Sequence, residues 1–194
     1  MQRRITEADI LDPAEYARIR TQRRRAMAAR KQHRRIEVGP HVTFYFESYD
    51  TMWLQVHEML HIERGGKDQI PDELAAYNPL IPQGNDLVAT FMIEIDDADR
   101  RHRVLAGLGG IEETAFIRLG AETIKARPET DADRTTAEGK ASSVQFVHFP
   151  FTPAQIAAFR SMEGEAVLGL SHPQYSHMAV IPPAVRQELS GDFA

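Results

Sequence analysis

The uneven distribution of charge limits the fold of this chain more than any other feature. Residues 1–35 hold eleven Lys and Arg against four Asp and Glu, a net of +7, whereas residues 36–194 hold twelve against twenty-four, a net of −12. A segment so dense in arginine cannot supply a hydrophobic core. The sequence therefore predicts a basic helical arm over 1–35 and a single α+β domain, which holds the core, over 36–194.

The arm is expected to form one helix on the protein surface. Asp12, Pro13 and Glu15 suit the N-cap, the first and the third position of a helix that can run to about His33. Arginines fall on nearly every side of this helix, so it cannot be deeply buried. Nucleic-acid binding through the helix is one alternative. Because the body offers complementary charge, we expect instead that its arginines pair with acidic residues of the body or of a second subunit, without nucleic-acid binding.

Strands follow one another through short turns in the rest of the chain. We predict strands over 36–46, 87–95, 114–119, 122–127, 142–149, 166–171 and 177–181. We predict helices over 50–64, 71–77 and 98–106, and two more that begin near Thr152 and Pro183. This order favours an α+β fold with a largely antiparallel sheet, packed helices and the N-terminal basic helix. Neither glycine-rich phosphate-loop pattern occurs.

Two features of composition exclude several classes of site. The chain has no cysteine, which excludes disulfides, thiolate zinc sites, cysteine-ligated iron–sulfur clusters and cysteine nucleophiles. No apolar run approaches the ~20 residues that a bilayer span needs, and the first residues lack the apolar core of a signal peptide. We therefore expect a cytoplasmic protein that does not contact a membrane.

The segment His57-Glu58-Met59-Leu60-His61 matches the HExxH pattern on a predicted helix. Histidines at i and i+4 lie on one face and can share a zinc ion, and the glutamate can act as base on a metal-bound water. A metal-dependent hydrolase that uses His57, Glu58 and His61 is therefore a second alternative. Against it, Arg64 replaces the glycine of the longer pattern, and the helical wheel turns both histidines toward solvent. We expect Glu58→Gln to leave any activity unchanged.

His172 and His177 form another candidate site, between two predicted strands. If residues 173–176 form a four-residue loop, the two imidazoles face each other across a hairpin, with Cβ atoms about 5 Å apart. That spacing suits zinc, iron, copper or nickel, with Tyr175 nearby as a hydrogen-bond donor or acid. The alternative is a polar turn in which the histidines cap the strand ends.

Two histidines need a carboxylate beside them to hold a divalent metal. The helical wheel places Glu63 within the apolar face of the HExxH helix, where a buried carboxylate needs a partner. The alternative is that Glu63 lies at the helix end and reaches water or an arginine. We predict that Glu58 or Glu63 lies within about 10 Å of His172 or His177 and completes a zinc or iron site.

Several short motifs are spread in order over nearly the whole chain. They are Thr6-Glu7-Ala8-Asp9-Ile10, Val38-Gly39-Pro40-His41-Val42-Thr43, Glu58-Met59-Leu60 with Glu63, Ala76-Tyr77-Asn78 with Pro82, and His172-Pro173 with Tyr175 and His177. In their order and in total length, the sequence resembles a bacterial family known only as domain of unknown function 3501. In that family the positions of His57 and His61 are usually not histidine, which weakens the hydrolase interpretation.

The resemblance implies a class of function but no reaction. Family members are often encoded beside rubrerythrin-like and iron–sulfur oxidoreductase-like genes, which implies redox or iron-handling partner proteins. Our first interpretation is a cytoplasmic, homo-oligomeric accessory protein with a polar, metal-binding pocket, and whether it is an enzyme stays open. The metal-ligand candidates are His172, His177, Glu58 and Glu63, and the further pocket candidates are Tyr175, Tyr77 and Asn78.

Overall fold

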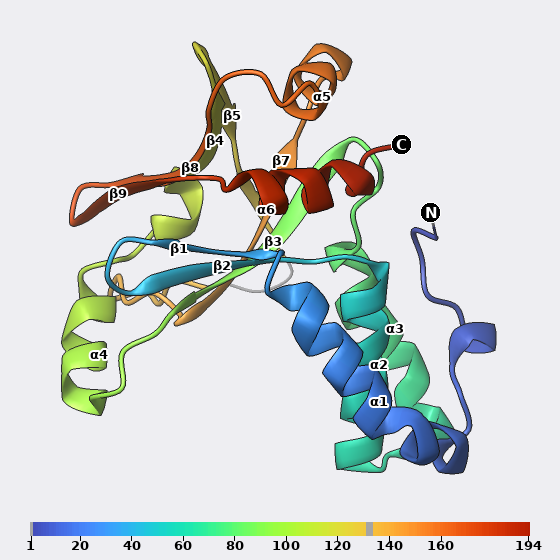
Figure 1. Cartoon of the computed structure of the whole chain (residues 1–194). Coiled ribbons are helices and arrows are strands. Elements are labelled where there is room, and N and C mark those ends of the chain that lie inside the picture. The colour runs from blue at the N-terminus through green and yellow to red at the C-terminus, as the bar shows by residue number, and fades with distance from the viewer. Residues whose placement is uncertain (1, 131–133) are drawn as a thin grey trace.

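The computed structural model describes residues 2–130 and 134–194, and it confirms the α+β class. The strands divide into two antiparallel sheets, which lie one above the other (Figure 1). Helices α1, α2 and α3 group together to one side of the sheets, with the N-terminal segment beside them (Figure 1). We call this group, residues 2–33 and 48–81, the helical lobe.

The larger sheet has the strand order β1-β2-β3-β7-β6, and each pairing is antiparallel. Its strands are β1 Arg35–Val38, β2 Val42–Phe46, β3 Asp86–Ile93, β7 Val144–Pro150 and β6 Arg127–Pro128. The single strand predicted over 36–46 is wrong, because the chain turns at Gly39. This residue adopts a φ of 72°, a left-handed conformation that glycine reaches without steric cost.

The smaller sheet has the strand order β5-β4-β8-β9. Its strands are β5 Glu122–Lys125, β4 Ala115–Leu119, β8 Ala166–His172 and β9 Tyr175–Val180. Buried apolar side chains of both sheets share one core, among them Phe44 and Phe91 of the larger sheet and Ile117 and Leu168 of the smaller one. Removing these side chains from water supplies the main force that holds the two sheets together.

The α-helices of the described residues are 7 to 19 residues long, and most have a side-chain N-cap. Their bounds are α1 Pro13–Lys31, α2 Tyr49–Glu63, α3 Ile70–Tyr77, α4 Ala98–Ala106, α5 Pro153–Arg160 and α6 Pro183–Leu189. Asp12, Ser48, Asp97 and Thr152 cap α1, α2, α4 and α5 by accepting from a backbone N–H of the first turn. None of the helices in the described residues is long and apolar enough to cross a bilayer.

The helical lobe has a small core of its own, in which α2 packs against both α1 and α3. Met52 and Val56 of α2 are buried there together with Leu80. The N-terminal segment also contributes, since Ile5 is only 1% exposed. The segment before α1 is therefore fixed to the lobe rather than free in solvent.

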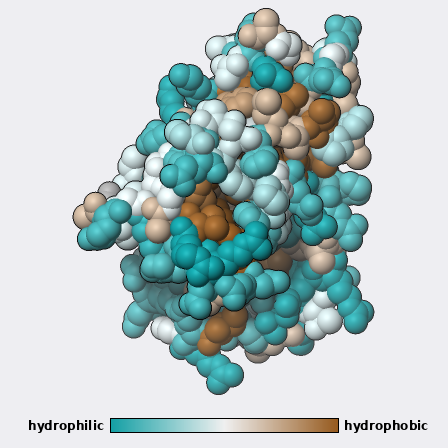
Figure 2. Space-filling model, turned by 90° about the vertical axis from the view of Figure 1, so that its left-hand side faces the viewer, coloured by the Kyte–Doolittle hydropathy of each residue, from teal (hydrophilic) through white to brown (hydrophobic). Residues whose placement is uncertain are grey.

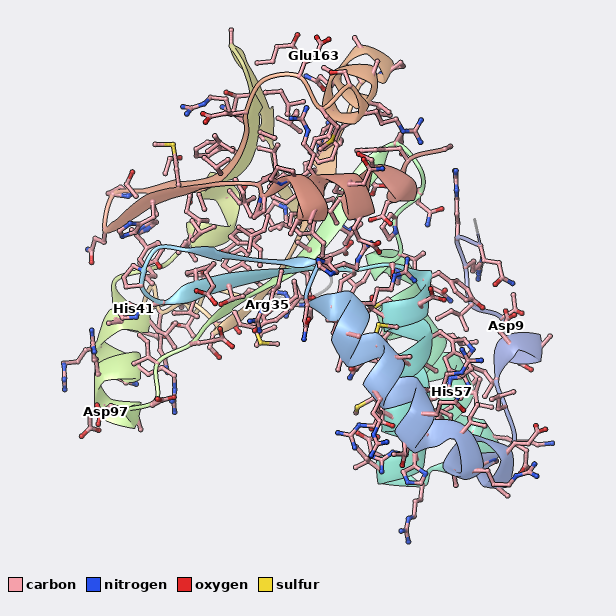
Figure 3. The ribbon with its side chains drawn as sticks, viewed as in Figure 1. Asp9, Arg35, His41, His57, Asp97 and Glu163 are labelled. Atoms are coloured by element: carbon pink, nitrogen blue, oxygen red, sulfur yellow. The ribbon has the colours of Figure 1, made fainter. Side chains whose placement is uncertain are left out.

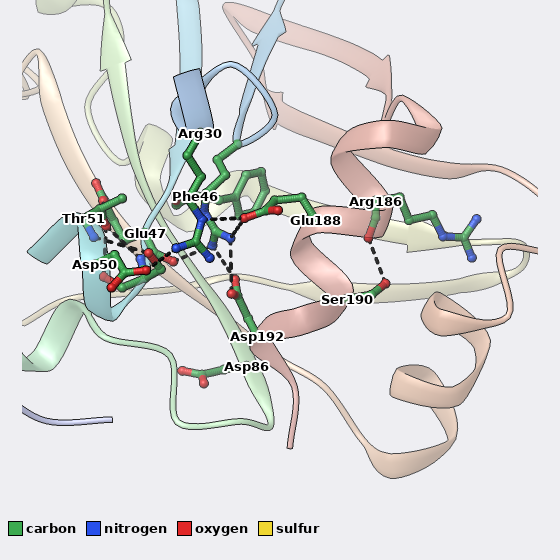
Figure 4. A network of polar contacts seen from close by, with 12 residues as sticks. Arg30, Phe46, Glu47, Asp50, Thr51, Asp86, Arg186, Glu188, Ser190 and Asp192 are labelled. Atoms are coloured by element: carbon green, nitrogen blue, oxygen red, sulfur yellow. Dashed lines mark hydrogen bonds and ion pairs between the residues drawn. The ribbon is translucent and has the colours of Figure 1, made fainter. Parts of the chain in front are cut away.

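Ion pairs join the end of α1 to the C-terminal residues (Figure 4). Arg34 is 1% exposed and pairs with Asp192 and Glu188. Arg30 pairs with Glu188 (2.8 Å) and also with Asp50. The expectation that arginines of the arm pair with acidic residues of the body is confirmed at these two positions. The division of the chain into an arm and a domain stays a prediction.

Candidate functional site

His57 is buried, so the solvent-facing position predicted from the helical wheel is wrong. It is 2% exposed because Tyr16 of α1 and the N-terminal segment cover this side of α2 (Figure 3). Its Nε2 accepts from the Leu11 N–H (3.0 Å), so its Nδ1 carries the proton and donates to the Trp53 carbonyl (2.7 Å). Burial lowers the pKa of this imidazole. Both ring nitrogens are occupied, which leaves no lone pair for a metal.

Glu58 joins α1 to α2. Arg20 donates to both of its carboxylate oxygens, at 2.7 and 2.8 Å, and the Tyr16 hydroxyl donates at 2.6 Å. Arg24 adds a longer ion pair of 3.8 Å. The hydrogen bonds from Arg20 are the main reason that the pKa of Glu58 falls to about 2. A carboxylate so strongly bound is a poor general base near neutral pH.

A cavity of about 960 Å³ lies between the N-terminal segment, the start of α1 and the C-terminal half of α2. We call it the lobe cavity. Its most buried lining residues are Tyr16 and His57. The apolar lining comes from Ile10, Leu11, Pro13, Ala14, Leu60 and Ile70, and the charged or ionisable lining comes from Glu7, Asp12, His61, Arg64 and Lys67. This volume and this composition fall in the range of small-molecule sites, roughly 300–1,000 Å³.

The basic residues of the lobe cavity lie at the end of α2 and in the turn that follows. The side chains of His61, Arg64 and Lys67 have no hydrogen-bond or ion-pair partner among the described residues. Arg64 has a φ of 57°, in the left-handed region where helices usually place glycine. From the sequence, His61 was predicted only as an alternative zinc ligand, and the turn after it only as a helix end, so Arg64 and Lys67 were not predicted as candidate site residues.

Glu63 lies at the exposed end of α2, as the alternative interpretation of the sequence expected. Its Oε2 accepts from the Gln69 side chain at 2.7 Å. The apolar stripe of α2 ends before this residue, so its carboxylate stays in water. Glu63 does not line the lobe cavity.

Tyr77 and Asn78 join segments within the lobe: Asn78 binds the N-terminal segment, and Tyr77 binds α2. The Asn78 side chain accepts from the Ile5 N–H (2.7 Å) and donates to the Ile5 carbonyl (2.9 Å). These two bonds copy the pairing that a neighbouring strand would offer. The Tyr77 hydroxyl accepts from Gln55 of α2 at 3.4 Å. Neither residue lines the lobe cavity.

The hairpin of β8 and β9 has a different register from the expected one. His172 pairs with Tyr175, and His177 pairs with Leu170. The turn therefore contains only residues 173–174, and the predicted four-residue loop is wrong. Because of this register, the two histidines do not face each other across the hairpin.

His172 is buried and uses both ring nitrogens within the fold. Its Nδ1 accepts from the Gln174 N–H at 3.2 Å, so its Nε2 carries the proton and donates to the Gly109 carbonyl at 3.2 Å. The ring thus joins the hairpin turn to the segment after α4. It is a strand-end histidine, as the alternative interpretation of this turn expected.

Tyr175 joins the hairpin of the smaller sheet to the β1–β2 turn of the larger sheet. Its hydroxyl donates to the Val38 carbonyl (2.8 Å) and accepts from the N–H groups of His41 (2.9 Å) and Val42 (3.1 Å). Burial raises the pKa of this phenol. A Cβ at Gly39 would lie 2.5 Å from His177 Cγ, so only glycine fits beside the hairpin. These motif residues hold the two sheets together.

The structure does not bring the carboxylates of α2 together with the histidines of β8 and β9. Figure 1 shows the hairpin at the opposite side of the molecule from the helical lobe. Within residues 2–130 and 134–194, no three His, Asp or Glu are grouped so that they can hold a metal ion. The nitrogens of His57 and His172 are also engaged, and Glu58 is held by arginine. A zinc or iron site made from the predicted residues does not fit this structure.

Comparisons with known proteins identify a family and a similar solved structure. A family model described as a protein of unknown function, DUF3501, matches residues 4–193. The crystal structure of a protein of unknown function from Burkholderia pseudomallei is 35% identical, with a TM-score of 0.90. The match covers 98% of this chain and 99% of that chain. A search of curated proteins finds no match.

Proposed function

From the premise that this chain belongs to the DUF3501 family of proteins of unknown function, we propose that it is a binding protein for a small organic anion with an apolar body. The family match also confirms the resemblance seen in the sequence. One observation carries the proposal. The lobe cavity combines a floor whose polar atoms are satisfied internally with a basic rim whose side chains have no partner among the described residues.

The floor of the lobe cavity is fixed before any ligand binds. Tyr16 donates its hydroxyl proton to Glu58, and both nitrogens of His57 are hydrogen-bonded. The rings of Tyr16 and His57 also pack together, with centroids 4.9 Å apart. A site whose lining is already ordered loses less conformational entropy on binding, which raises affinity. Tyr16 and His57 therefore form an ordered floor for a ligand, and their polar atoms are already hydrogen-bonded within the protein.

The walls of the lobe cavity favour a ligand with a hydrocarbon or aromatic part. Leu11 lines it from the N-terminal segment, Leu60 lines it from α2, and Ile70 lines it from the start of α3. Transfer of apolar ligand surface from water to such walls lowers the free energy by roughly 25 cal/mol per Å². The size of the cavity suits a molecule of one or two rings rather than a single ion.

The rim favours a negative group at the end of α2. Arg64 and Lys67 carry fixed positive charges there, and His61 can add a donor. Of the two acidic lining residues, Glu7 belongs to the N-terminal segment rather than to the end of α2. Asp12 accepts from the Ala14 N–H (2.9 Å) and faces the positive end of the α1 dipole, which offsets its charge. A carboxylate, sulfonate or phosphate is therefore the group that we expect beside residues 61–67.

A binding role agrees with the accessory function that the family resemblance implies. The redox or iron-handling partners and the homo-oligomeric state remain predictions, and the lobe cavity does not depend on them. The metal-dependent hydrolase is not proposed, because His57 and Glu58 are both committed to internal hydrogen bonds.

Fluorescence titration with anilinonaphthalenesulfonate tests the proposal, because this probe joins aromatic rings to one negative group. We expect saturable binding with one site per chain. Arg64→Glu and Lys67→Glu should each weaken binding of the sulfonate about tenfold, which is the effect of about 1.4 kcal/mol. The uncharged analogue phenylnaphthylamine should bind these variants as it binds the unmodified protein.

Lys125→Glu is the matched control, since Lys125 is an exposed lysine on β5 in the smaller sheet. It makes the same change in net charge away from the lobe cavity. If this control weakened the probe as much as Lys67→Glu, the effect would be one of overall charge. That result, or the absence of saturable binding, would overturn the proposal.

A further inference from the structure

The two sheets end in four edge strands, and three of these carry residues that discourage association. The edges are β1 and β6 in the larger sheet and β5 and β9 in the smaller one. β1 carries exposed Arg35 and Glu37, β5 carries Glu122 and Lys125, and β6 consists of Arg127 and Pro128. Charged side chains and proline on an edge strand oppose pairing with a strand of another molecule.

The fourth edge, β9, lacks this protection. Its sequence, Tyr175 to Val180, reads YSHMAV and contains no Asp, Glu, Lys, Arg or Pro. In the part of the chain that the structure describes, β9 has a strand partner, β8, on one side only. Met178 is 57% exposed and Val180 is 52% exposed, although both are apolar. Two of the most exposed apolar side chains of the described residues thus lie on one unprotected edge.

The surface around β9 extends the apolar character of this edge. Phe116 of β4 and Met178 of β9 lie on either side of Gly169, where an added Cβ would come within 2.4 and 2.9 Å of them. The three residues therefore form one row across the outer face of the smaller sheet. Figure 2 views the molecule from the side on which the β8–β9 hairpin ends, and it shows apolar surface exposed in the upper part of this face.

We infer that β9 is the interface through which two copies of this chain associate, by antiparallel pairing of β9 with β9. A strand without charge meets its own copy without repulsion, which favours a second copy over a charged partner. Antiparallel pairing about a two-fold axis satisfies the free edge of both strands and joins the two smaller sheets into one. It also brings Met178 and Val180 of each copy beside the same residues of the other.

The short length of β9 limits the strength of the association between two copies that we expect. Six residues span about 20 Å at ~3.3 Å per residue, so the buried surface is smaller than that of a permanent dimer. We therefore expect association that depends on protein concentration. The lobe cavity lies at the other side of the molecule, so the inference does not depend on the proposed binding function.

Sedimentation velocity over a range of concentrations tests this inference with the full chain. We expect the unmodified protein to shift from monomer to dimer as its concentration rises. Met178→Lys combined with Val180→Lys should raise the dimer dissociation constant at least about tenfold, because like charges on neighbouring strands repel. Both side chains are more than half exposed, so the monomer should fold normally.

Ile62→Lys is the matched control, because Ile62 is 63% exposed but lies on α2 in the helical lobe. This variant should dimerise like the unmodified protein. Hydrogen exchange of the unmodified protein gives a second measurement that needs no variant. The β9 amides should gain protection as concentration rises, while the β5 amides should not. A protein that stays monomeric up to about 1 mM, or a dimer that the double substitution leaves intact, would overturn the inference.

Discussion

The helical lobe and the pair of sheets use similar polar motifs, and in the lobe a cavity of about 960 Å³ lies beside them. In the sheets, the Tyr175 hydroxyl has three hydrogen-bond partners, and both nitrogens of His172 are engaged. In the lobe, His57 and Glu58 are satisfied just as fully. The difference is that basic side chains with no partner in the described part of the chain adjoin the lobe motif. The motif residues join distant segments, and the proposed binding residues lie next to those of the lobe.

Packing explains why the cavity lies in the lobe. The two sheets share one large core in which apolar side chains from both layers meet, so little space remains between them. The lobe core is small, and the N-terminal segment covers α2 only through a few anchors such as Ile5 and Leu11. Where this segment leaves α2, the end of the helix and the following turn stay uncovered. The cavity forms at that point.

Removing the Tyr175 hydroxyl should give the largest loss of stability. Tyr175→Phe leaves one buried carbonyl and two N–H groups without their partner, at a cost of roughly 1–3 kcal/mol for each group that stays unsatisfied. We expect the free energy of unfolding to fall by about 2–3 kcal/mol, while affinity for anilinonaphthalenesulfonate stays unchanged. Urea denaturation measures the first quantity. Tyr45→Phe is the control, since that hydroxyl makes one exposed bond to Glu94 (3.1 Å) and its loss should have a small effect.

A substitution in the lobe should change both stability and binding. Asn78→Ala removes the two hydrogen bonds to Ile5, which should lower the free energy of unfolding by about 1–2 kcal/mol. Because the N-terminal segment forms one wall of the lobe cavity, its release should also weaken the probe severalfold. Asn85→Ala replaces an exposed asparagine outside this contact and is the control. Unchanged probe affinity in Asn78→Ala would show that the segment is not needed to form the cavity.

The sequence predicted features that depend on contacts within a few residues, and it missed features that depend on contacts between distant segments. The bounds of α1 and α4 could be predicted, because N-caps such as Asp12 and helix stops such as Gly107 act within a few residues. The burial of His57 could not, because it depends on Tyr16 and on Leu11, which is 46 positions away. The helical wheel of α2 showed an apolar face, but it could not show which other segment of the chain covers the margin of that face.

The predicted metal ligands do not come together, for a related reason. The register of β8 and β9 depends on a turn of two residues rather than four, and the difference changes which side chains face each other. The sequence contains histidines and carboxylates, which are suitable metal ligands, but it does not show where α2 lies relative to the β8–β9 hairpin. The lobe cavity was missed because its fixed positive charges come from exposed residues at the end of α2 and in the following turn, whose only visible signal in the sequence was Gly65-Gly66.

The two regions should also respond to pH in opposite directions, through His57 in the lobe and His148 in the larger sheet. Burial acts to lower the pKa of His148, but Asp86 (3.2 Å) and Glu129 (2.6 Å) together raise it. Its contribution to stability is therefore complete below the ordinary histidine pKa of 6.5 and is lost as pH rises through the raised value. The pKa of His57 is lowered, so its contribution is present above 6.5 and is lost as pH falls through the lowered value.

Thermal unfolding of His148→Gln and His57→Gln across pH separates these contributions. The deficit of His148→Gln relative to the unmodified protein should be larger at acid than at alkaline pH. The deficit of His57→Gln should be larger at alkaline pH, since only the neutral ring can accept from the Leu11 N–H. Deficits that vary with pH in the same direction in both variants would contradict the opposite pKa shifts of the two histidines.

The smallest expected effect concerns Arg64, where stability and binding should change in opposite directions. Its φ of 57° is unfavourable for a residue with a Cβ, and glycine removes that penalty. Arg64→Gly should therefore raise the free energy of unfolding by up to about 1 kcal/mol. The same substitution removes a fixed positive charge from the rim of the lobe cavity, so the sulfonate probe should bind more weakly. Arg64→Asn supplies the comparison, because asparagine tolerates this conformation better than most residues but also lacks the charge. If both variants gained stability and lost affinity for the anion but not for phenylnaphthylamine, the arginine would be present for its charge, against the preference of the backbone. A loss of stability in Arg64→Gly would instead assign the arginine a structural role at the end of α2.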